Sequence, residues 1–335
     1  MRRKILEPRT ANPVYLVTQF RGSRDSWIKL LSKNIDICYI RWIKPRQIAA
    51  SAGKTKMKEI SETTKYFISK AVRLFLDNPW LGERESQVYK LIGECESNYE
   101  IDLLLDLLGR FTYLGAEEYK KSFDSIANQV VNVWGLDSAS TQIAAISWDD
   151  SSDSGQFVLH ALKPSLSRLG GGPYPLVSKA NKVNSLANKC PNIVLVDEFF
   201  GTGKTIKIRA DYIRKNWPKN LAKPEIYVAM MAGMRTAKFK FSHLVQDVYV
   251  CYELEKGITG HYAGDELDNA RYEMSRLEGR LAEKVDGKNL PVCGYGAAEA
   301  LFGSETNIPN SVFPVFWWPE LRSGELREPL FTRYE

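Results

Sequence analysis

One stretch, residues 192–205, constrains the fold of this 335-residue chain more than any other; it reads NIVLVDEFFGTGKT. Its apolar run, Ile193–Val196, is short and rich in β-branched residues, which predicts a strand buried on both faces. An acidic pair, Asp197 and Glu198, follows the run, and a glycine-rich turn comes next. In residues 206–217 apolar side chains recur at helical spacing. The stretch therefore predicts a strand, an acidic pair, a turn and a helix, in that order.

The glycine-rich turn, Gly201 to Thr205, has the composition of an anion-binding site. The N-terminus of a helix leaves backbone N–H groups without partners and carries partial positive charge, so it attracts anions. Gly201 and Gly203 let the backbone approach an anion closely, while Thr202, Lys204 and Thr205 supply donors. Carboxylates at the strand end accept bonds from ribose hydroxyls or hold a hydrated metal ion. The stretch is therefore predicted to bind a phosphorylated sugar.

Other interpretations of the stretch are weaker. A P-loop ATPase would use Lys204, but its motif needs a glycine five positions before Gly203, where this chain has Glu198. A buried strand followed by an ordinary glycine turn gives the acidic pair no role. The order of residue types resembles instead the phosphoribosyl diphosphate (PRPP) motif of type I phosphoribosyltransferases. The resemblance implies that Asp197 and Glu198 bind the ribose 2′ and 3′ hydroxyls and that residues 201–205 bind the 5′-phosphate.

Strands and helices alternate around this stretch. Residues 141–146, 226–231 and 245–253 are further strand candidates, and segments with helical spacing separate them. This alternation predicts an α/β fold with a parallel sheet, flanked by helices, whose site lies at the carboxyl ends of the strands. We divide the chain into a basic arm and linker (1–58), a mainly helical region (59–135), a type I phosphoribosyltransferase-like core (136–253) and a C-terminal extension (254–335).

The resemblance also implies a pyrophosphate loop and a flexible flap upstream of residue 192. Residues 147–155 take the place of the loop, and residues 166–182, with three consecutive glycines, take that of the flap. The candidates for pyrophosphate binding are Ser151, Ser154, Gly155, Arg168, Lys179 and Lys182. The loop departs from the family pattern because Asp149, Asp150 and Asp153 stand where a small or basic residue would face an anion. Either Mg²⁺ bridges these carboxylates, or the loop meets a base or an attacking group, or it is a solvated loop without a role.

Three motifs in the C-terminal third narrow the resemblance. They are Cys293–Gly296, Asn307–Asn310 and the aromatic run Phe313–Trp318. Together with the PRPP-like motif and the loop sequence SSDSGQF (residues 151–157), they resemble the phosphoribosyltransferase-like domain with a C-terminal extension found in bacterial conflict systems, over residues 86–320. Some members accompany retron reverse transcriptases as effectors. From the residues alone, packing is the favoured role of the aromatic run, and contact with a base is the alternative.

The net charge of +6 conceals an asymmetry. Residues 1–58 hold 14 Lys and Arg against 3 Asp and Glu, a balance of +11, which leaves −5 for the remainder. This arm is expected to contact nucleic acid or an acidic partner, such as a reverse transcriptase and its RNA or DNA product; a solvated tail without a partner is the alternative. The five cysteines are scattered and form no CxxC pair, which argues against a zinc site. Since no apolar run approaches a membrane span, a cytoplasmic protein is expected.

The resemblance implies Mg²⁺-dependent chemistry at ribose C1. Asp197 and Glu198 would hold the ribose and, with it, the metal, while Asp149 or Asp150 would assist a nucleophile or the metal. The activity would be that of a transferase or of a nucleotide-cleaving enzyme in an anti-phage effector. The alternative is a catalytically inactive module that senses a nucleotide, or binds nucleic acid or a partner, with the same pocket.

Overall fold

The computed structural model describes residues 62–148, 154–170 and 172–333. The basic arm, residues 1–58, and three site candidates, Asp149, Asp150 and Ser151, lie outside the described residues. The described residues all belong to one compact unit.

A five-stranded parallel sheet carries the centre of this unit. Its strands are β2 (Thr141–Ala145), β3 (Leu176–Val177), β4 (Asn192–Phe200), β5 (Glu225–Met234) and β6 (Asp247–Leu254). They lie in the order β3-β2-β4-β5-β6, so the apolar run of residues 193–196 forms part of the middle strand. All four of those side chains are fully buried. Because every pair is parallel, the carboxyl ends of the strands share one edge. The predicted α/β fold is confirmed.

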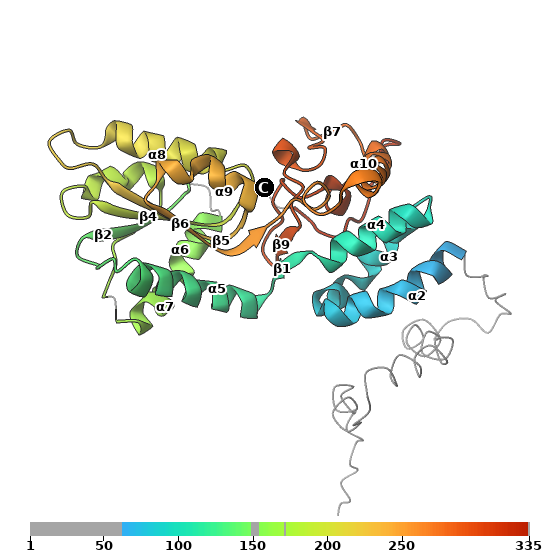
Figure 1. Cartoon of the computed structure of the whole chain (residues 1–335), viewed down its shortest axis with the longest axis horizontal. Helices are drawn as coiled ribbons and strands as arrows, with labels where there is room; N and C mark the ends of the chain where they lie inside the picture. The colour runs from blue at the N-terminus through green and yellow to red at the C-terminus, as the bar shows by residue number, and fades with distance from the viewer. Residues whose placement is uncertain (1–61, 149–153, 171, 334–335) are drawn as a thin grey trace, which may run out of the picture. The chain divides into compact units, whose positions relative to one another are not determined.

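Helices cover the sheet, and Figure 1 shows α8 on one side of it and α5 and α7 on the other. The helices around the sheet are α5 (Ala116–Asn128), which continues as a π-helix (Gln129–Val133), α6 (Ser154–Ala161), α7 (Lys163–Arg168), α8 (Lys204–Asn216) and α9 (Arg235–Phe241). Two short 3₁₀ helices, Ala180–Leu186 after β3 and Ser242–Leu244 after α9, belong to the same part of the chain. Each connection from strand to helix passes the same edge of the sheet, where the glycine turn lies between β4 and α8.

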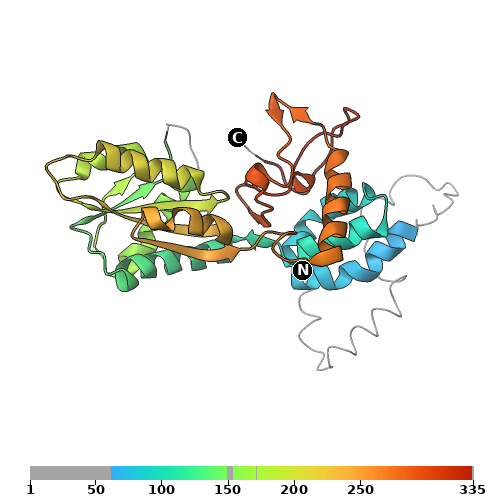
Figure 2. The same cartoon turned by 45° about the horizontal axis from the view of Figure 1, so that its top comes forward.

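The helical region before the sheet packs against the C-terminal extension (Figure 2). Its elements are α2 (Glu62–Asp77), a 3₁₀ helix (Pro79–Arg84), α3 (Glu85–Gly93), α4 (Asn98–Gly109) and β1 (Thr112–Leu114). The extension contains α10 (Gly264–Gly279), β7 (Lys284–Val285), β8 (Lys288–Asn289), β9 (Phe302–Ser304) and two 3₁₀ helices (Tyr295–Ala297 and Pro314–Phe316). Strand β1 pairs in parallel with β9, and the buried Glu100 of α4 accepts two bonds from Arg280, at 3.0 and 2.9 Å.

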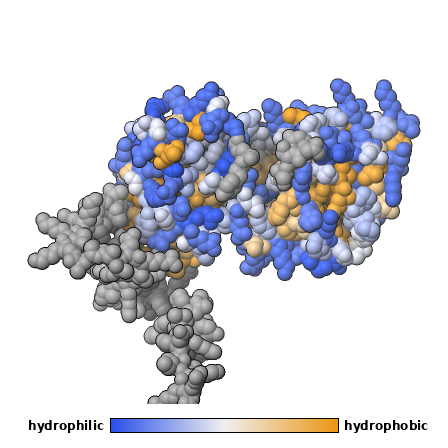
Figure 3. Space-filling view, turned by 180° about the vertical axis from the view of Figure 1, so that it is seen from behind, coloured by the Kyte–Doolittle hydropathy of each residue, from blue (hydrophilic) through white to orange (hydrophobic). Residues whose placement is uncertain are grey.

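Polar and apolar residues are interspersed on the surface that Figure 3 shows. Seen from behind, apolar residues gather in one area of the part that carries the parallel sheet, on the right in Figure 3. Across the described ranges, no helix combines the length and the apolar character that a membrane span requires.

Candidate functional site

A cavity of about 500 Å³ opens at the carboxyl ends of β4 and β5. It is lined by the whole glycine turn, by Asp197 and by residues of the extension. The lining residues are Ile146, Asp197, Phe199 to Ile206, Met230, Tyr295, Pro309, Asn310 and Ser311. The structure thus places the PRPP-like motif in a cavity at the edge where ligands bind in open α/β sheets.

The turn leaves the first amides of α8 available to an anion. Gly203 precedes the helix in a left-handed conformation, with φ at +74°, and no side chain caps the helix. The N–H of Lys204 lies 3.4 Å from the Thr202 hydroxyl oxygen, which is a weak contact. Backbone N–H groups in the first turn of a helix have no intrahelical acceptor. The end of α8 therefore offers donors and partial positive charge to the cavity.

Of the two predicted carboxylates, only Asp197 lines the cavity. Strand β4 continues through the acidic pair to Phe200, and successive side chains of a strand point to opposite sides. The Asp197 Oδ1 atom accepts bonds from the Ser154 hydroxyl at 2.6 Å and from the Glu198 N–H at 2.7 Å. Ser154 begins α6, so it brings the end of the predicted pyrophosphate loop to the motif. The next residue, Gly155, packs closely on β2, since a Cβ there would lie 3.2 Å from the Ser147 hydroxyl.

Glu198 is instead buried against α5, with 4% of its surface exposed. The Tyr119 hydroxyl donates to Glu198 Oε1, and the same hydroxyl lies 2.8 Å from Thr306 Oγ1 in the extension. Burial raises the pKa of the Glu198 carboxyl, and the Tyr119 bond opposes that rise. Glu198 thereby ties the end of β4 to α5 and to the segment after β9.

The extension supplies a wall of the cavity that packs directly against the glycine turn. A Cβ on Gly201 would overlap the Ser311 hydroxyl, and a Cβ on Gly296 would lie 2.7 Å from Thr202. The wall is strained, because Cys293 (φ +55°) and Glu299 (φ +52°) adopt the left-handed conformation that L side chains disfavour. Two backbone N–H groups and the Thr259 hydroxyl donate to the Glu299 carboxylate, which fixes this loop. The asparagine motif and the Cys-Gly-Tyr-Gly motif therefore meet at the cavity.

Comparison with known proteins agrees with this architecture. A protein-family model, PRTase-CE (phosphoribosyltransferase with C-terminal extension), matches residues 94–333, which include the sheet, the cavity and the extension. The chain belongs to the PRTase-CE family. A search of curated proteins found no match.

Two solved structures resemble the PRTase-CE chain at low similarity. One is the hypoxanthine-guanine phosphoribosyltransferase of Schistosoma mansoni in complex with IMP, with 16% identity and a TM-score of 0.27; the match covers 41% of this chain and 62% of that one. The other is a hypothetical protein from Neisseria gonorrhoeae with bound ppGpp, with 13% identity and a TM-score of 0.30, covering 50% of this chain and 98% of that one. The PRTase-CE chain thus spans less than two thirds of the schistosome enzyme.

The predicted flap residues lie away from the cavity in this PRTase-CE structure. Arg168 ends α7, and its guanidinium donates to Asp124 of α5 and, at 3.1 Å, to the Ser165 hydroxyl. Lys179 is buried where β3 leads into a 3₁₀ helix, and Lys182 is exposed on that helix. None of the three lines the cavity.

The side chains that line the cavity fit Mg²⁺ only if a bound ligand supplies some of the oxygen atoms around the ion. Within the described ranges no group of three or more His, Cys, Asp or Glu side chains could hold a metal by itself. Mg²⁺, however, usually binds one or two carboxylates and completes its shell with water and ligand phosphate oxygens. Asp197, the carboxylate that lines the cavity, would hold it jointly with a ligand. The ion would there neutralise negative charge on phosphate oxygens.

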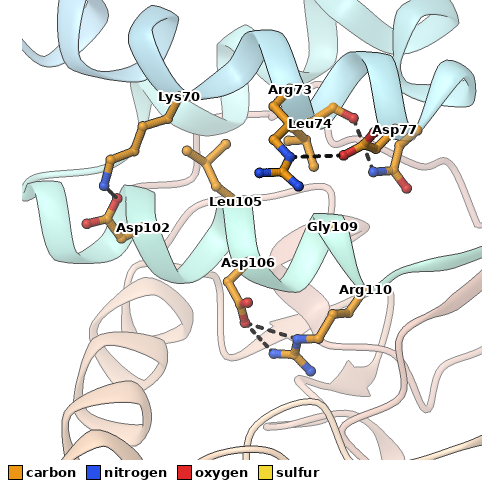
Figure 4. A pocket seen from close by; sticks show the side chains of 10 residues that line it. Lys70, Arg73, Leu74, Asp77, Asp102, Leu105, Asp106, Gly109 and Arg110 are labelled. Carbon is orange, nitrogen blue, oxygen red and sulfur yellow. Dashed lines mark hydrogen bonds and ion pairs between the residues drawn. The ribbon is translucent and has the colours of Figure 1, made fainter. Parts of the chain in front are cut away.

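Apart from this cavity, a groove of about 510 Å³ lies between α2 and α4 (Figure 4). Its charged side chains pair with one another: Lys70 lies 2.6 Å from Asp102, and Arg110 lies 2.5 Å from Asp106. Such partly exposed, mutually neutralised pairs need no ligand. The groove is therefore a poorer candidate than the cavity at the glycine turn.

Stability should fall with rising pH because of Glu278, a buried residue of α10 behind the strained loop. Its carboxylate accepts the Cys293 N–H at 3.0 Å; burial raises its pKa from 4.5 to about 7, and the nearby Glu299 adds to the rise. Since the folded state holds this proton more tightly, its contribution is complete below pH 4.5 and is lost as pH rises through about 7. In urea unfolding between pH 4 and 8, Glu278→Gln should remove about 3 kcal/mol of that decline. The exposed Asp268→Asn should leave the decline unchanged, and an unaltered decline in Glu278→Gln would contradict the assignment.

Proposed function

We propose that the cavity binds the ribose 5-phosphate group of a nucleotide or of PRPP. The observation that carries this proposal is the conjunction of the uncapped start of α8, the glycine turn and Asp197 in one cavity. The 5′-phosphate would accept bonds from the first amides of α8 and from Thr202, Lys204 and Thr205. Asp197 would accept a bond from a ribose hydroxyl.

We further propose that the protein acts at ribose C1. The leaving group, a pyrophosphate or a base, departs from C1 with the electron pair of the broken bond. An incoming nucleophile donates the electron pair of the new bond to C1. Positive charge develops on the sugar during this exchange, so the Asp197 carboxylate would stabilise the transition state. The protein is then a pentosyl transferase or a nucleotide-cleaving enzyme.

Such an activity suits the effector of a bacterial anti-phage system, in which a nucleotide is modified or depleted. Resemblance to conflict-system proteins, some of which accompany retron reverse transcriptases, supports this role. The basic arm would hold the reverse transcriptase or its nucleic acid. Removal of residues 1–58 should weaken that binding most at low salt; unchanged binding would exclude the arm as the contact.

The position of Glu198 favours a second candidate function, binding without turnover. One of the two motif carboxylates is bonded to Tyr119 and does not line the cavity. A cavity with a single carboxylate could hold a ribose phosphate as a signal while it stabilises the charged transition state less. The same pocket would then sense a nucleotide.

One experiment separates the two functions. The purified chain is incubated with Mg²⁺ and PRPP, nucleoside phosphates or NAD, and every product is identified by mass spectrometry. With an enzyme, Asp197→Asn should lower product formation about 10²- to 10³-fold. The exposed Asp211→Asn on α8 should not change it. Binding without product would favour the sensor, whereas failure to bind any ribose phosphate would overturn both functions.

A further inference from the structure

A second cavity of about 750 Å³ lies in the C-terminal extension, next to the ribose-phosphate cavity. Tyr295 and Asn310 line both cavities, and the Tyr295 N–H donates to the Asn310 carbonyl at 2.8 Å. The two cavities are therefore neighbours, with these two residues at their boundary. Cavities of this volume are typical of small-molecule sites.

The lining of the second cavity includes aromatic and basic side chains, beside three prolines and the acidic Asp286. Trp317 and Trp318 contribute their indoles, and Lys288 and Arg333 contribute cations. The Arg333 guanidinium lies over the Trp317 ring, 5.4 Å from its centre. Flat aromatic ligands stack on indole rings and on guanidinium planes alike. The lining therefore suits an aromatic ring better than a sugar or an aliphatic chain.

The two indoles differ in their hydrogen bonding. The Trp317 N–H donates to the Val312 carbonyl at 3.0 Å. Trp318 is buried, with 4% of its surface exposed, and its N–H has no acceptor among the described residues. The N–H atom is itself buried, and a buried donor without an acceptor destabilises the protein, so a ligand acceptor that reached it as the side chains around the cavity adjust would gain that energy on binding. The ring nitrogens and carbonyl oxygens of nucleobases are such acceptors.

We propose that this extension cavity binds the nucleobase of a nucleotide whose ribose 5-phosphate occupies the first cavity. The inference rests on the proposed function and narrows it, because PRPP has no base and would leave the extension cavity unfilled. The extension would then select nucleotides from among other ribose phosphates. Tyr295 and Asn310, at the boundary, would lie beside the ribose C1 to which the base is attached.

Titration calorimetry with ribose 5-phosphate, AMP and GMP tests the inference. At least one nucleotide should bind more than tenfold tighter than ribose 5-phosphate. Trp318→Phe keeps a ring but removes the N–H, and should weaken nucleotide binding about fivefold while ribose 5-phosphate binding stays unchanged. Because Trp318 is buried, Arg333→Met serves as a second variant with the same expected pattern, about tenfold. Arg322→Met is the matched control, since Arg322 is exposed, pairs with Glu283 and does not line this cavity.

The outcomes distinguish the two claims. If ribose 5-phosphate binds but no nucleotide binds tighter, the inference fails and the ribose-phosphate site stands. If Trp318→Phe and Arg333→Met weaken both kinds of ligand equally, or neither kind, the base does not lie in this cavity. If neither ribose 5-phosphate nor any nucleotide binds, both the inference and the proposed function fail.

Discussion

Replacing Gly203 with alanine should lower the free energy of unfolding by about 3 kcal/mol and weaken ribose 5-phosphate binding more than tenfold. A left-handed φ disfavours any residue with a Cβ by about 1–2 kcal/mol. The new Cβ would also lie 2.5 Å from Cδ1 of Phe241, and overpacking of this kind costs about 1–3 kcal/mol. Relief of the overlap must shift the turn, so the amides of α8 would no longer face the phosphate. Urea unfolding and calorimetry measure the two effects.

Gly170→Ala is the matched control. Gly170 has nearly the same φ, +72°, but a Cβ there meets nothing within 4 Å. Its replacement should cost about 1 kcal/mol and leave ligand binding unchanged. Equal losses of stability and binding in the two variants would show that the overlap with Phe241 and the position of the turn do not matter.

Arg327→Met should lower the free energy of unfolding by about 3 kcal/mol, which is more than the replacement of an exposed side chain costs. The Arg327 side chain is 1% exposed and forms a fork with Glu94, with bonds of 2.9 and 2.6 Å. It also donates to the carbonyls of Trp318, at 2.7 Å, and Val315, at 3.0 Å. Removal of the guanidinium would leave two buried carbonyls and a partly buried carboxylate without these donors, and thermal or urea unfolding would measure the loss.

The control for this second variant is Lys90→Met. Lys90 of α3 also joins the helical region to the end of the chain, through Glu328, but both partners are exposed, at 45% and 68%. Exposed pairs contribute less than about 1 kcal/mol. If Arg327→Met proves no more destabilising than Lys90→Met, the fork with Glu94 does not hold the extension in place.

The sequence predicted the part of the site that local patterns encode. The run of residues 193–196, the turn and the start of the helix are specified within fourteen consecutive residues, and the structure places them as expected. The sequence does not show where β4 ends, because Phe199 and Phe200 are as compatible with a strand as with a turn. The strand therefore includes the acidic pair, and this separates Asp197 from Glu198.

What the sequence could not show depends on long-range contacts. Tyr119 lies 79 positions before Glu198, and no local pattern links the two. Ser311 meets Gly201 from a segment more than 100 positions further along the chain, and no local pattern links the two. The one available signal is Gly201 itself, since a glycine can mark a close approach of another segment. The favoured packing role of Phe313–Trp318 describes their burial but not the cavity beside Trp318.

The pairing of β1 with β9 has a consequence for synthesis of the protein. Thr112 pairs with Phe302, so the helical region is completed by a strand that is synthesised much later. A ribosome that has reached residue 290 has already made the sheet, the glycine turn and Asp197, but not Tyr295, Asn310 or Ser311. The nascent chain thus carries one part of the cavity lining, and the cavity is complete only after Ser311 has been made.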